Sequence, residues 1–263
     1  MLVIEKMNKT FELGGGTFKR AIRDLDFTAA KGDFVTIVGS NGAGKSTLLN
    51  LIAGVYAPDS GNISISSTNI TNLPEYKRAK YIGRVFQDPM MGTAGSMSIE
   101  ENLAMSIKRG EKRGLKLGVN GRREQFRTVL KRLDLGLENR LKDQVRLLSG
   151  GQRQALTLMM ATLTAPEVLL LDEHTAALDP KTAARIIELT KEIVSDNQLI
   201  VLMVTHNLQQ ALELGNRTIM MHDGEIVLDL FGPERENTSV DSLLEAFSRV
   251  KKERFLDDRA LLA

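Results

Sequence analysis

The chain has 263 residues, enough for one large domain or a domain that carries a subdomain. Apolar residues make up 42% and charged residues 26%, as in ordinary globular proteins, and a net charge of +2 is too small to require a polyanionic partner. Because the chain has no cysteine, disulfide bonds and cysteine-based metal sites are excluded.

The first 30 residues predict a small antiparallel sheet. Apolar and β-branched stretches at residues 2–7, 11–13 and 22–27 read as strands, and a glycine turn at residues 14–16 lies between them. Residues 62–66 are expected to join this sheet.

Further along, short apolar strands alternate with helical patterns, which predicts an α/β core with a largely parallel sheet. The expected strands are residues 34–38, 82–86, 168–172, 199–205 and 218–222. Their continuous apolar character is typical of strands that are covered on both faces. Residues 1–237 are predicted to form the main domain.

A glycine-rich loop follows the first of these strands and opens a helix. The loop consists of Gly39, Ser40, Asn41, Gly42, Ala43, Gly44, Lys45, Ser46 and Thr47. It has the G-x-x-x-x-G-K-[ST] pattern, in which backbone N–H groups and a helix N-terminus bind phosphate. We expect Lys45 to reach the β- and γ-phosphates of ATP, Ser46 to ligate Mg²⁺ and Thr47 to assist at the α- and β-phosphates.

From about residue 90 to 165 the strand signals vanish, and this stretch predicts an α-helical subdomain inserted in the core. Helices are expected at residues 98–107, 122–133 and 150–163, with glycine turns between Gly110 and Gly121. The segment 108–132 is rich in Lys and Arg. It is interpreted either as a face near anionic lipid headgroups or, more simply, as a solvated helical face.

The last helix of this subdomain begins with Leu148-Ser149-Gly150-Gly151-Gln152. Ser149 is a good N-cap, and the glycines expose N–H groups at a second helix N-terminus, which makes a second phosphate-binding surface. Because one nucleotide cannot easily use both surfaces of a compact domain, we expect two copies to face each other head to tail. Each copy would then lend this surface to the ATP of the other.

Two adjacent carboxylates, Asp172 and Glu173, end the strand at residues 168–172. Successive side chains of a strand point to opposite faces, so different roles are expected. Asp172 is expected to hold Mg²⁺, and Glu173 to polarise the attacking water as general base. His206 follows the next strand and is expected to contact the γ-phosphate and Glu173, with a capping or core role as the alternative.

The remaining features are two further histidines and the C-terminal segment. The other two histidines, His174 and His222, are interpreted as structural residues. Residues 238–263 form a tail in which Leu243, Leu244, Phe247 and Val250 recur at helical spacing. This predicts a short helical tail that is too short to form another domain.

These motifs resemble those of ABC-transporter nucleotide-binding domains, from Leu2 to Asp229. The matching elements stand in family order and spacing: Walker A at 39–47, Gln87, the signature at 148–152, Walker B at 168–173, the D-loop Ala177-Leu178-Asp179 and the switch histidine His206. The resemblance implies that Gln87 contacts Mg²⁺ or the water and senses a membrane partner. It also implies that Ser149, Gly150, Gly151 and Gln152 form the surface that binds ATP across a dimer, with Asp179 in the dimer seam.

The resemblance also implies an aromatic side chain that stacks on adenine from the N-terminal sheet. Phe11 matches best and Phe18 is the rival, while either residue could instead be ordinary core. One position departs from the family, which often has proline after the glutamate, whereas this chain has His174.

The resemblance finally implies an ATPase subunit of a bacterial importer, similar to those of amino-acid uptake systems. Its expected partners are a second ATP-binding subunit, separate permease subunits and a solute-binding protein, at the cytoplasmic face of the membrane. The longest apolar runs are too short to cross a bilayer, and the N-terminal residues lack a secretory-signal pattern. The alternatives are the ATPase of an export or lipid-extraction complex, and a soluble ABC ATPase of the iron–sulfur assembly type. No nucleic-acid-binding module is recognised.

Overall fold

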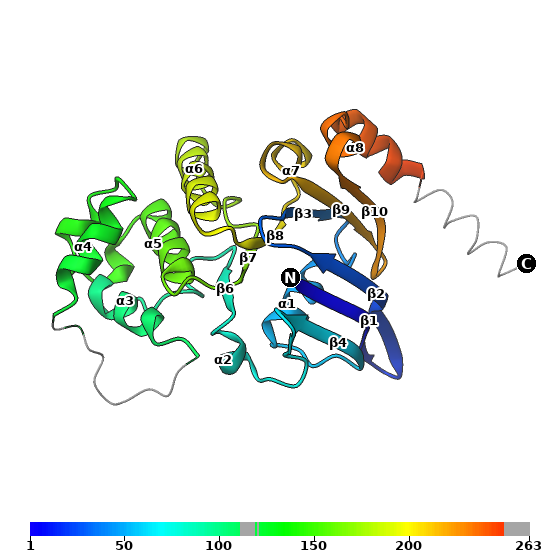
Figure 1. The fold of residues 1–263 in the computed structure, drawn as a ribbon, viewed down its shortest axis with the longest axis horizontal. Helices are drawn as coiled ribbons and strands as arrows, with labels where there is room; N and C mark the ends of the chain where they lie inside the picture. Colours follow the sequence, from blue (N-terminus) through cyan, green and yellow to red (C-terminus); the bar gives the residue numbers. More distant parts are fainter. Residues whose placement is uncertain (111–118, 120, 250–263) are drawn as a thin grey trace, which may run out of the picture.

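The computed structural model of the protein describes residues 1–110, 119 and 121–249 (Figure 1). Within these ranges the strands form two sheets. The N-terminal sheet is antiparallel and has the order β2-β1-β4-β5. Its strands are β1 (Leu2–Gly14), β2 (Thr17–Ala29), β4 (Ser60–Ile65) and β5 (Thr68–Asn69).

The second sheet has the order β10-β9-β3-β8-β7-β6. Its strands are β3 (Phe34–Gly39), β6 (Ile82–Val85), β7 (Val168–Asp172), β8 (Ile200–Val204), β9 (Arg217–His222) and β10 (Glu225–Phe231). All pairs in it are parallel except β9 with β10, which are antiparallel. The predicted α/β core with a largely parallel sheet and an antiparallel N-terminal sheet is therefore confirmed.

The helices are unevenly distributed around the larger sheet (Figure 1). They are α1 (Lys45–Ala53), α2 (Glu75–Arg78), α3 (Ile99–Ile107), α4 (Arg123–Lys131), α5 (Gly150–Thr162), α6 (Pro180–Asn197), α7 (Leu208–Leu214) and α8 (Gly232–Glu236). Helices α3, α4 and α5 gather at one end of the molecule, and β1 and β2 lie toward the other. Of the helices in the described part of the chain, none is long and apolar enough for a membrane span.

Both faces of the larger sheet are buried. In β7, Val168 and Leu170 belong to the apolar cluster under the N-terminal sheet and α1, whereas Leu169 and Leu171 belong to the cluster under the helical subdomain. The same alternation continues in β8. Two-sided burial explains why these strands are continuously apolar in sequence. The parallel pairing of β3, β8 and β7 places their C-terminal ends at one edge of the sheet.

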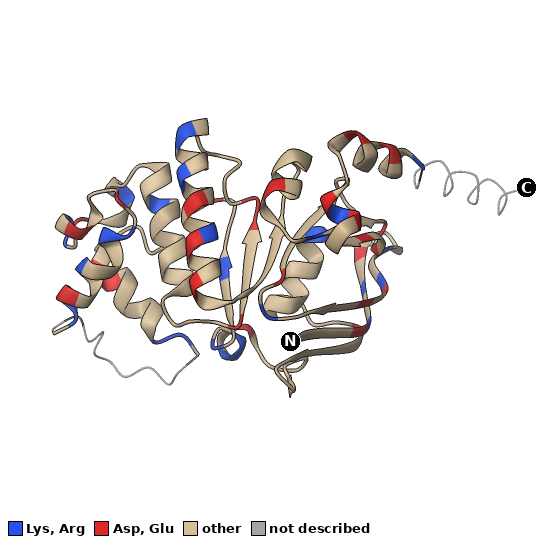
Figure 2. Cartoon of the chain, turned by 45° about the horizontal axis from the view of Figure 1, so that its top comes forward, with Lys and Arg blue, Asp and Glu red and all other residues tan. Residues whose placement is uncertain are grey.

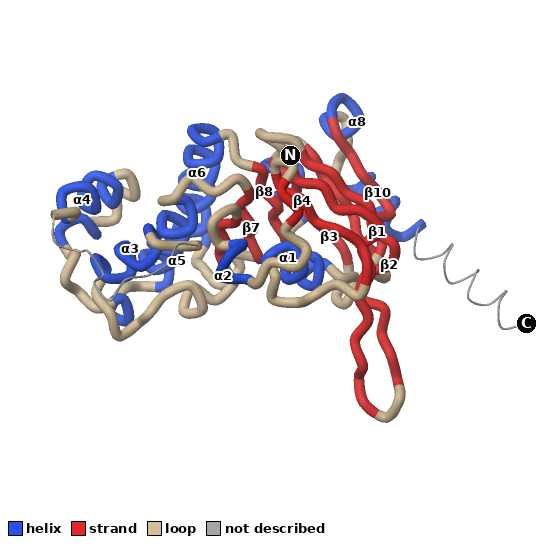
Figure 3. Tube along the Cα trace, turned by 60° about the horizontal axis from the view of Figure 1, so that its bottom comes forward, coloured by secondary structure: helices blue, strands red, loops and turns tan. Residues whose placement is uncertain are grey.

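The N-terminal strands are longer than expected. Residues 2–7 and 11–13, predicted as separate strands, belong to the single strand β1, which pairs with β2 along a hairpin that projects from the domain (Figure 3). Register shifts near Met7 and Lys9 and positive φ angles at Lys6 and Asp24 bend the hairpin without ending it. The turn at residues 14–16 is the hairpin tip.

A buried arginine fastens the C-terminal end of α1. Arg78 is 1% exposed, and its guanidinium donates hydrogen bonds to four backbone carbonyls. The acceptors, at 2.6–2.9 Å, are the carbonyl oxygens of Leu51, Ile52, Thr71 and Leu73. Two of these carbonyls end α1, where helix carbonyls have no partner within the helix. The arginine thereby ties α1 to the segment after β5.

The basic segment 108–132 lies partly outside the described residues. Where it is described, its arginines pair with acids: Arg123 Nε lies 2.7 Å from Glu100 Oε2, and Arg132 Nη2 lies 2.6 Å from Asp196 Oδ2. Figure 2 shows basic and acidic residues interspersed over these helices. Glu100 is buried, whereas the Arg132–Asp196 pair is exposed, as is typical of a solvated helical face.

The chain is helical again over residues 240–249. Leu243 of this helix is fully buried, and the Phe247 ring meets the His222 ring edge-on, with 6.3 Å between the centroids. His222 thus takes part in packing. The expected tail residue Val250 lies outside the described residues.

Candidate nucleotide-binding site

The loop at residues 39–44 connects β3 to α1, and its shape requires glycine at two points. Gly39 has φ 147°, and a Cβ there would lie 2.2 Å from the Met221 carbonyl oxygen. Gly44 has φ 103°, and a Cβ there would lie 2.5 Å from the Ala21 carbonyl oxygen. Larger residues would therefore displace neighbouring backbone. The loop ends at the N-terminus of α1, where free N–H groups favour anions.

Lys45 begins α1 and is 8% exposed. Its Nζ donates hydrogen bonds to the carbonyl oxygens of Gly39 at 2.8 Å and Ser40 at 3.0 Å. Burial lowers the pKa of Lys45, while the negative charges of Glu173 and Asp172 act in the opposite direction. The loop itself therefore holds this ammonium group at the place where phosphate oxygens would bind.

A cavity of about 290 Å³ lies over this loop. Its lining consists of Phe11, Lys19, Ala21, residues 41–47 and Glu173. Phe11 is held edge-on by Tyr56, with ring centroids 5.1 Å apart. The rival Phe18 is 66% exposed and is not part of the lining. The hairpin thus brings Phe11, and not Phe18, to the cavity that contains the phosphate loop.

Lys19 is a cavity residue that the sequence reasoning missed. It pairs with Phe11 across the β1–β2 hairpin, and its Nζ lies 3.1 Å from the point that a Cβ on Gly42 would occupy. The register of the hairpin, counted from its glycine turn, is the signal that could have placed Lys19 opposite Phe11.

Asp172 lies at the end of β7, and its side chain is 20% exposed. Burial raises the pKa of Asp172, and Arg84 on the neighbouring strand opposes this, with Nη2 3.9 Å from Oδ2. Arg84 was not expected from the sequence, because its proximity depends on β6 pairing with β7. A carboxylate and the Ser46 hydroxyl offer the oxygen ligands that Mg²⁺ prefers, so this donor set fits the metal.

Glu173 follows Asp172 with φ 43°, a conformation that is unfavourable for residues other than glycine. Its N–H donates to the Val204 carbonyl oxygen at 3.0 Å, which ties it to the end of β8. His206 Nδ1 lies 3.2 Å from Glu173 Oε2. The bent backbone turns the carboxylate toward the phosphate-loop cavity, whose lining includes Glu173, and His206 stands beside it.

The signature sequence forms a helix cap away from this cavity. Ser149 Oγ accepts a hydrogen bond from the Gln152 N–H at 3.2 Å, and Gln152 Oε1 accepts one from the Ser149 N–H at 3.2 Å. This reciprocal capping box leaves the N-terminus of α5 well formed. None of the residues 148–152 is among those that line the phosphate-loop cavity.

Besides residues 148–152, six predicted residues lie outside the cavity lining: Gly39, Ser40, Gln87, Asp172, Asp179 and His206. Gln87 follows β6 and is exposed. Asp179 caps α6 by accepting a hydrogen bond from the Thr182 N–H at 3.1 Å, and this bond lowers the pKa of Asp179. His174 is 2% exposed and lies 3.4 Å from Thr190 Oγ1, as a structural residue would.

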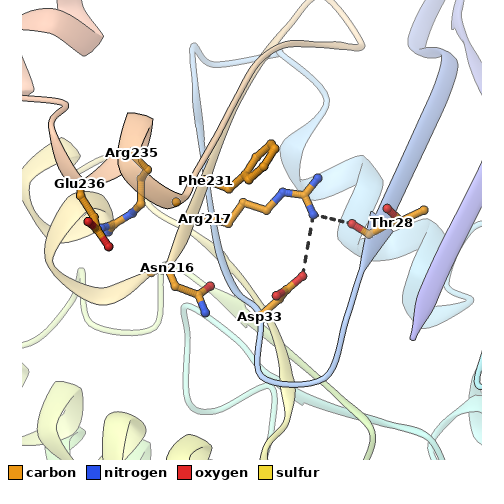
Figure 4. Close-up of a pocket in the computed structure, with 9 residues that line it drawn as sticks. Thr28, Asp33, Asn216, Arg217, Phe231, Arg235 and Glu236 are labelled. Atoms are coloured by element: carbon orange, nitrogen blue, oxygen red, sulfur yellow. Dashed lines mark hydrogen bonds and ion pairs between the residues drawn. The ribbon is translucent and has the colours of Figure 1, made fainter.

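A larger cavity of about 620 Å³ lies elsewhere, between β9 and α8 (Figure 4). Its central cation, Arg217, is bound to Asp229 at 2.5 Å, to Asp33 at 3.8 Å and to the Thr28 carbonyl at 2.6 Å. No residue predicted for the site belongs to its lining. Arg217 is already paired with two carboxylates, so the smaller cavity is the better candidate.

The geometry defines a P-loop ATPase: a phosphate loop, the carboxylate of Asp172 at the end of β7, and the Glu173–His206 pair at the same sheet edge. Comparison with known proteins identifies the family within this class. The ABC transporter family model matches residues 22–176. The chain belongs to the ABC transporter family, and within it the chain is an ATP-binding, ATP-hydrolysing cassette.

Individual relatives extend the likeness over most of the chain. The tyrosine transport ATP-binding protein of Clostridioides difficile is 47% identical over 247 residues, which cover 94% of this chain and 98% of the relative. The methionine import ATP-binding protein MetN 1 of Bacillus thuringiensis is 32% identical over 230 residues, 86% of this chain and 65% of the relative.

Among solved structures, a dimeric ATP-binding cassette in a post-hydrolysis state bound to ADP and Pi has a TM-score of 0.74 and 28% identity. The match covers 88% of this chain and 98% of that one. An ATP-binding cassette in its ADP conformation has a TM-score of 0.78 and 27% identity, covering 94% of this chain and 98% of that one.

Proposed function

We propose that this chain is the ATP-hydrolysing subunit of an importer of amino acids, which acts at the cytoplasmic face of a membrane with separate permease subunits and a solute-binding protein. The observation that carries this proposal is the 47% identity with a tyrosine transport ATP-binding protein, over nearly the whole length of both chains. The methionine import relative supports an amino-acid cargo. We therefore take amino acids, with tyrosine first, as the cargo to test.

In the proposed reaction, residues 39–47 bind the triphosphate, Lys45 contacts the β- and γ-phosphates, and Phe11 stacks on adenine. Mg²⁺ would be held by Ser46 and Asp172, with Gln87 near its water, and would neutralise charge on the phosphate oxygens. Glu173 accepts a proton from the attacking water as the water oxygen bonds to the γ-phosphorus, the bond from that phosphorus to the β–γ bridging oxygen breaks, and ADP leaves. His206 keeps the Glu173 carboxylate in place and contacts the γ-phosphate.

The active unit in this proposal is a head-to-tail dimer. The N-terminus of α5 is an intact anion-binding helix end, yet residues 148–152 are not part of the cavity in their own chain. A second copy would place its Ser149 and Gly151 against the γ-phosphate, with Asp179 along the seam. The dimeric cassette among the solved structures supports pairing of two copies.

Reconstitution tests the proposed function. The chain would be co-expressed with the permease and binding protein encoded beside its gene, and the complex placed in vesicles. Phosphate release should rise when tyrosine-loaded binding protein is added, and a Glu173→Gln complex should show no such rise. Failure of the chain to co-purify with any permease would refute a role in import and favour a soluble ABC ATPase. ATP-driven release of solute or lipid from the membrane would favour an exporter.

A further inference from the structure

One buried side chain links the signature helix to both catalytic loops. Gln154 lies on α5, two residues after the capping Gln152, and is 1% exposed. Its Nε2 donates hydrogen bonds to the His174 carbonyl oxygen at 2.7 Å and to the Phe86 carbonyl oxygen at 3.2 Å. Both acceptors are carbonyls, so the amide must present its NH₂ group, and each hydrogen has one partner.

The two carbonyls lie in the main chain close to the predicted site residues Gln87 and Glu173. The Phe86 carbonyl is in the same peptide group as the Gln87 N–H, and His174 directly follows Glu173. A second contact from α5 supports the first loop, because a Cβ on Gly92 would lie 2.6 Å from Thr157 Cγ2. The loop after β6 and the loop after β7 are therefore both held against α5.

The loop that carries His174 is also fixed from α6 and α7. Thr190 Oγ1 lies 3.4 Å from His174 Nε2, and Gln210 Nε2 donates to Thr175 Oγ1 at 3.2 Å. When α5 is displaced, the Gln154 amide pulls on the His174 carbonyl and so shifts the loop after β7 relative to its contacts with α6 and α7. The Gln154 Oε1 atom is buried without a hydrogen-bond partner. A buried acceptor without a partner costs free energy of folding, and the two hydrogen bonds that the Gln154 amide donates offset this cost.

We propose that Gln154 is a positioning residue that couples the two ATP sites of the dimer. The inference rests on the proposed head-to-tail pairing. When the N-terminus of α5 binds the partner's nucleotide, Gln154 transmits the position of that helix to the peptide that contains the Gln87 N–H and to the carbonyl of His174, the residue after Glu173. Hydrolysis in one site then depends on the occupancy of the other.

The test uses Gln154→Met in the full chain, because methionine fills a similar volume without a donor. Thr162→Val is the matched control: Thr162 lies on the same helix and is buried, and its hydroxyl donates, among the described residues, to the Leu158 and Met159 carbonyls of its own helix. ATP binding to the single cassette should stay unchanged in both variants. In Gln154→Met, kcat should fall about ten-fold, the effect of losing one or two positioning hydrogen bonds, and the Hill coefficient for ATP should fall toward one. Thr162→Val should keep both values.

Unchanged kcat and cooperativity in Gln154→Met, or a loss equal to that in Thr162→Val, would overturn the coupling role. Hydrogen exchange on the wild-type protein gives a second measurement that needs no substitution. ATP should slow exchange in residues 86–92 and 174–178 together with residues 149–155, and protection of 149–155 alone would contradict the inference. A wild-type protein that binds ATP but never dimerises would refute the proposed dimer, whereas a normal Gln154→Met dimer with full activity refutes only the role of Gln154.

Discussion

His174 should make the stability of this protein depend on pH, because burial lowers its pKa from 6.5 to about 4. Thr190 Oγ1 donates its hydrogen to the Ile186 carbonyl at 2.7 Å, so it accepts from the His174 Nε2–H. Because burial lowers the pKa to about 4, the imidazole is neutral in the folded protein near neutral pH, whereas the unfolded chain binds a proton near pH 6.5. The stability from this group is fully present above pH 6.5 and is lost as the pH falls toward 4.

The magnitude follows from the two pKa values. A fall from 6.5 to about 4 corresponds to at most about 3 kcal/mol of unfolding free energy, of which about 2 kcal/mol is lost between pH 7 and pH 5. Other groups also titrate in this range, so the comparison needs His174→Gln, which cannot gain a proton. Urea unfolding of both proteins at several pH values measures the difference between them.

The wild-type protein should lose about 2 kcal/mol more than His174→Gln between pH 7 and pH 5. Above pH 7 the gap between the two proteins should be constant. Parallel stability curves through pH 5 would refute the reasoning, because they would mean that His174 takes up its proton equally well in the folded and unfolded states.

Three further substitutions test the site. Glu173→Gln should bind ATP normally but release phosphate at least about 100-fold more slowly, as expected for a lost general base; full turnover would exclude that role. Phe11→Ala should weaken ATP binding about ten-fold in a calorimetric titration, the size of one lost stacking contact, and Phe18→Ala should leave it unchanged. Weaker ATP binding in Phe18→Ala together with unchanged binding in Phe11→Ala would assign the stacking to Phe18. Gly39→Ala should abolish ATP binding, because its Cβ would lie 2.2 Å from the Met221 oxygen; normal affinity would contradict the loop geometry.

The larger sheet and the phosphate loop could be predicted because their signals are local. Strands buried on both faces are continuously apolar, and the loop pattern fixes its own position between β3 and α1. The hairpin β9–β10 also carries a local sequence signal, the pair Asp223-Gly224 at its turn. Asp223 and Gly224 have φ 47° and 84°, the type I′ turn that Asp-Gly favours between two strands.

Other parts of the site depend on contacts between distant segments. Arg84 approaches Asp172 only because β6 pairs with β7, and the Gln154 bonds require three elements to meet. The positive φ of Glu173 has no sequence signal, because it is imposed by the bond between its N–H and Val204. Such features follow from packing, and the chain pattern alone does not encode them.

The grip of Arg78 on α1 has a mechanical consequence. The C-terminal end of α1 cannot slide along the helix axis without breaking the two charge-assisted hydrogen bonds that the Leu51 and Ile52 carbonyls accept from Arg78. The phosphate-binding tip at its head therefore keeps its place relative to the central strands whether or not a triphosphate is bound. We therefore expect nucleotide-driven motion to displace other parts of the molecule relative to α1, which keeps its position.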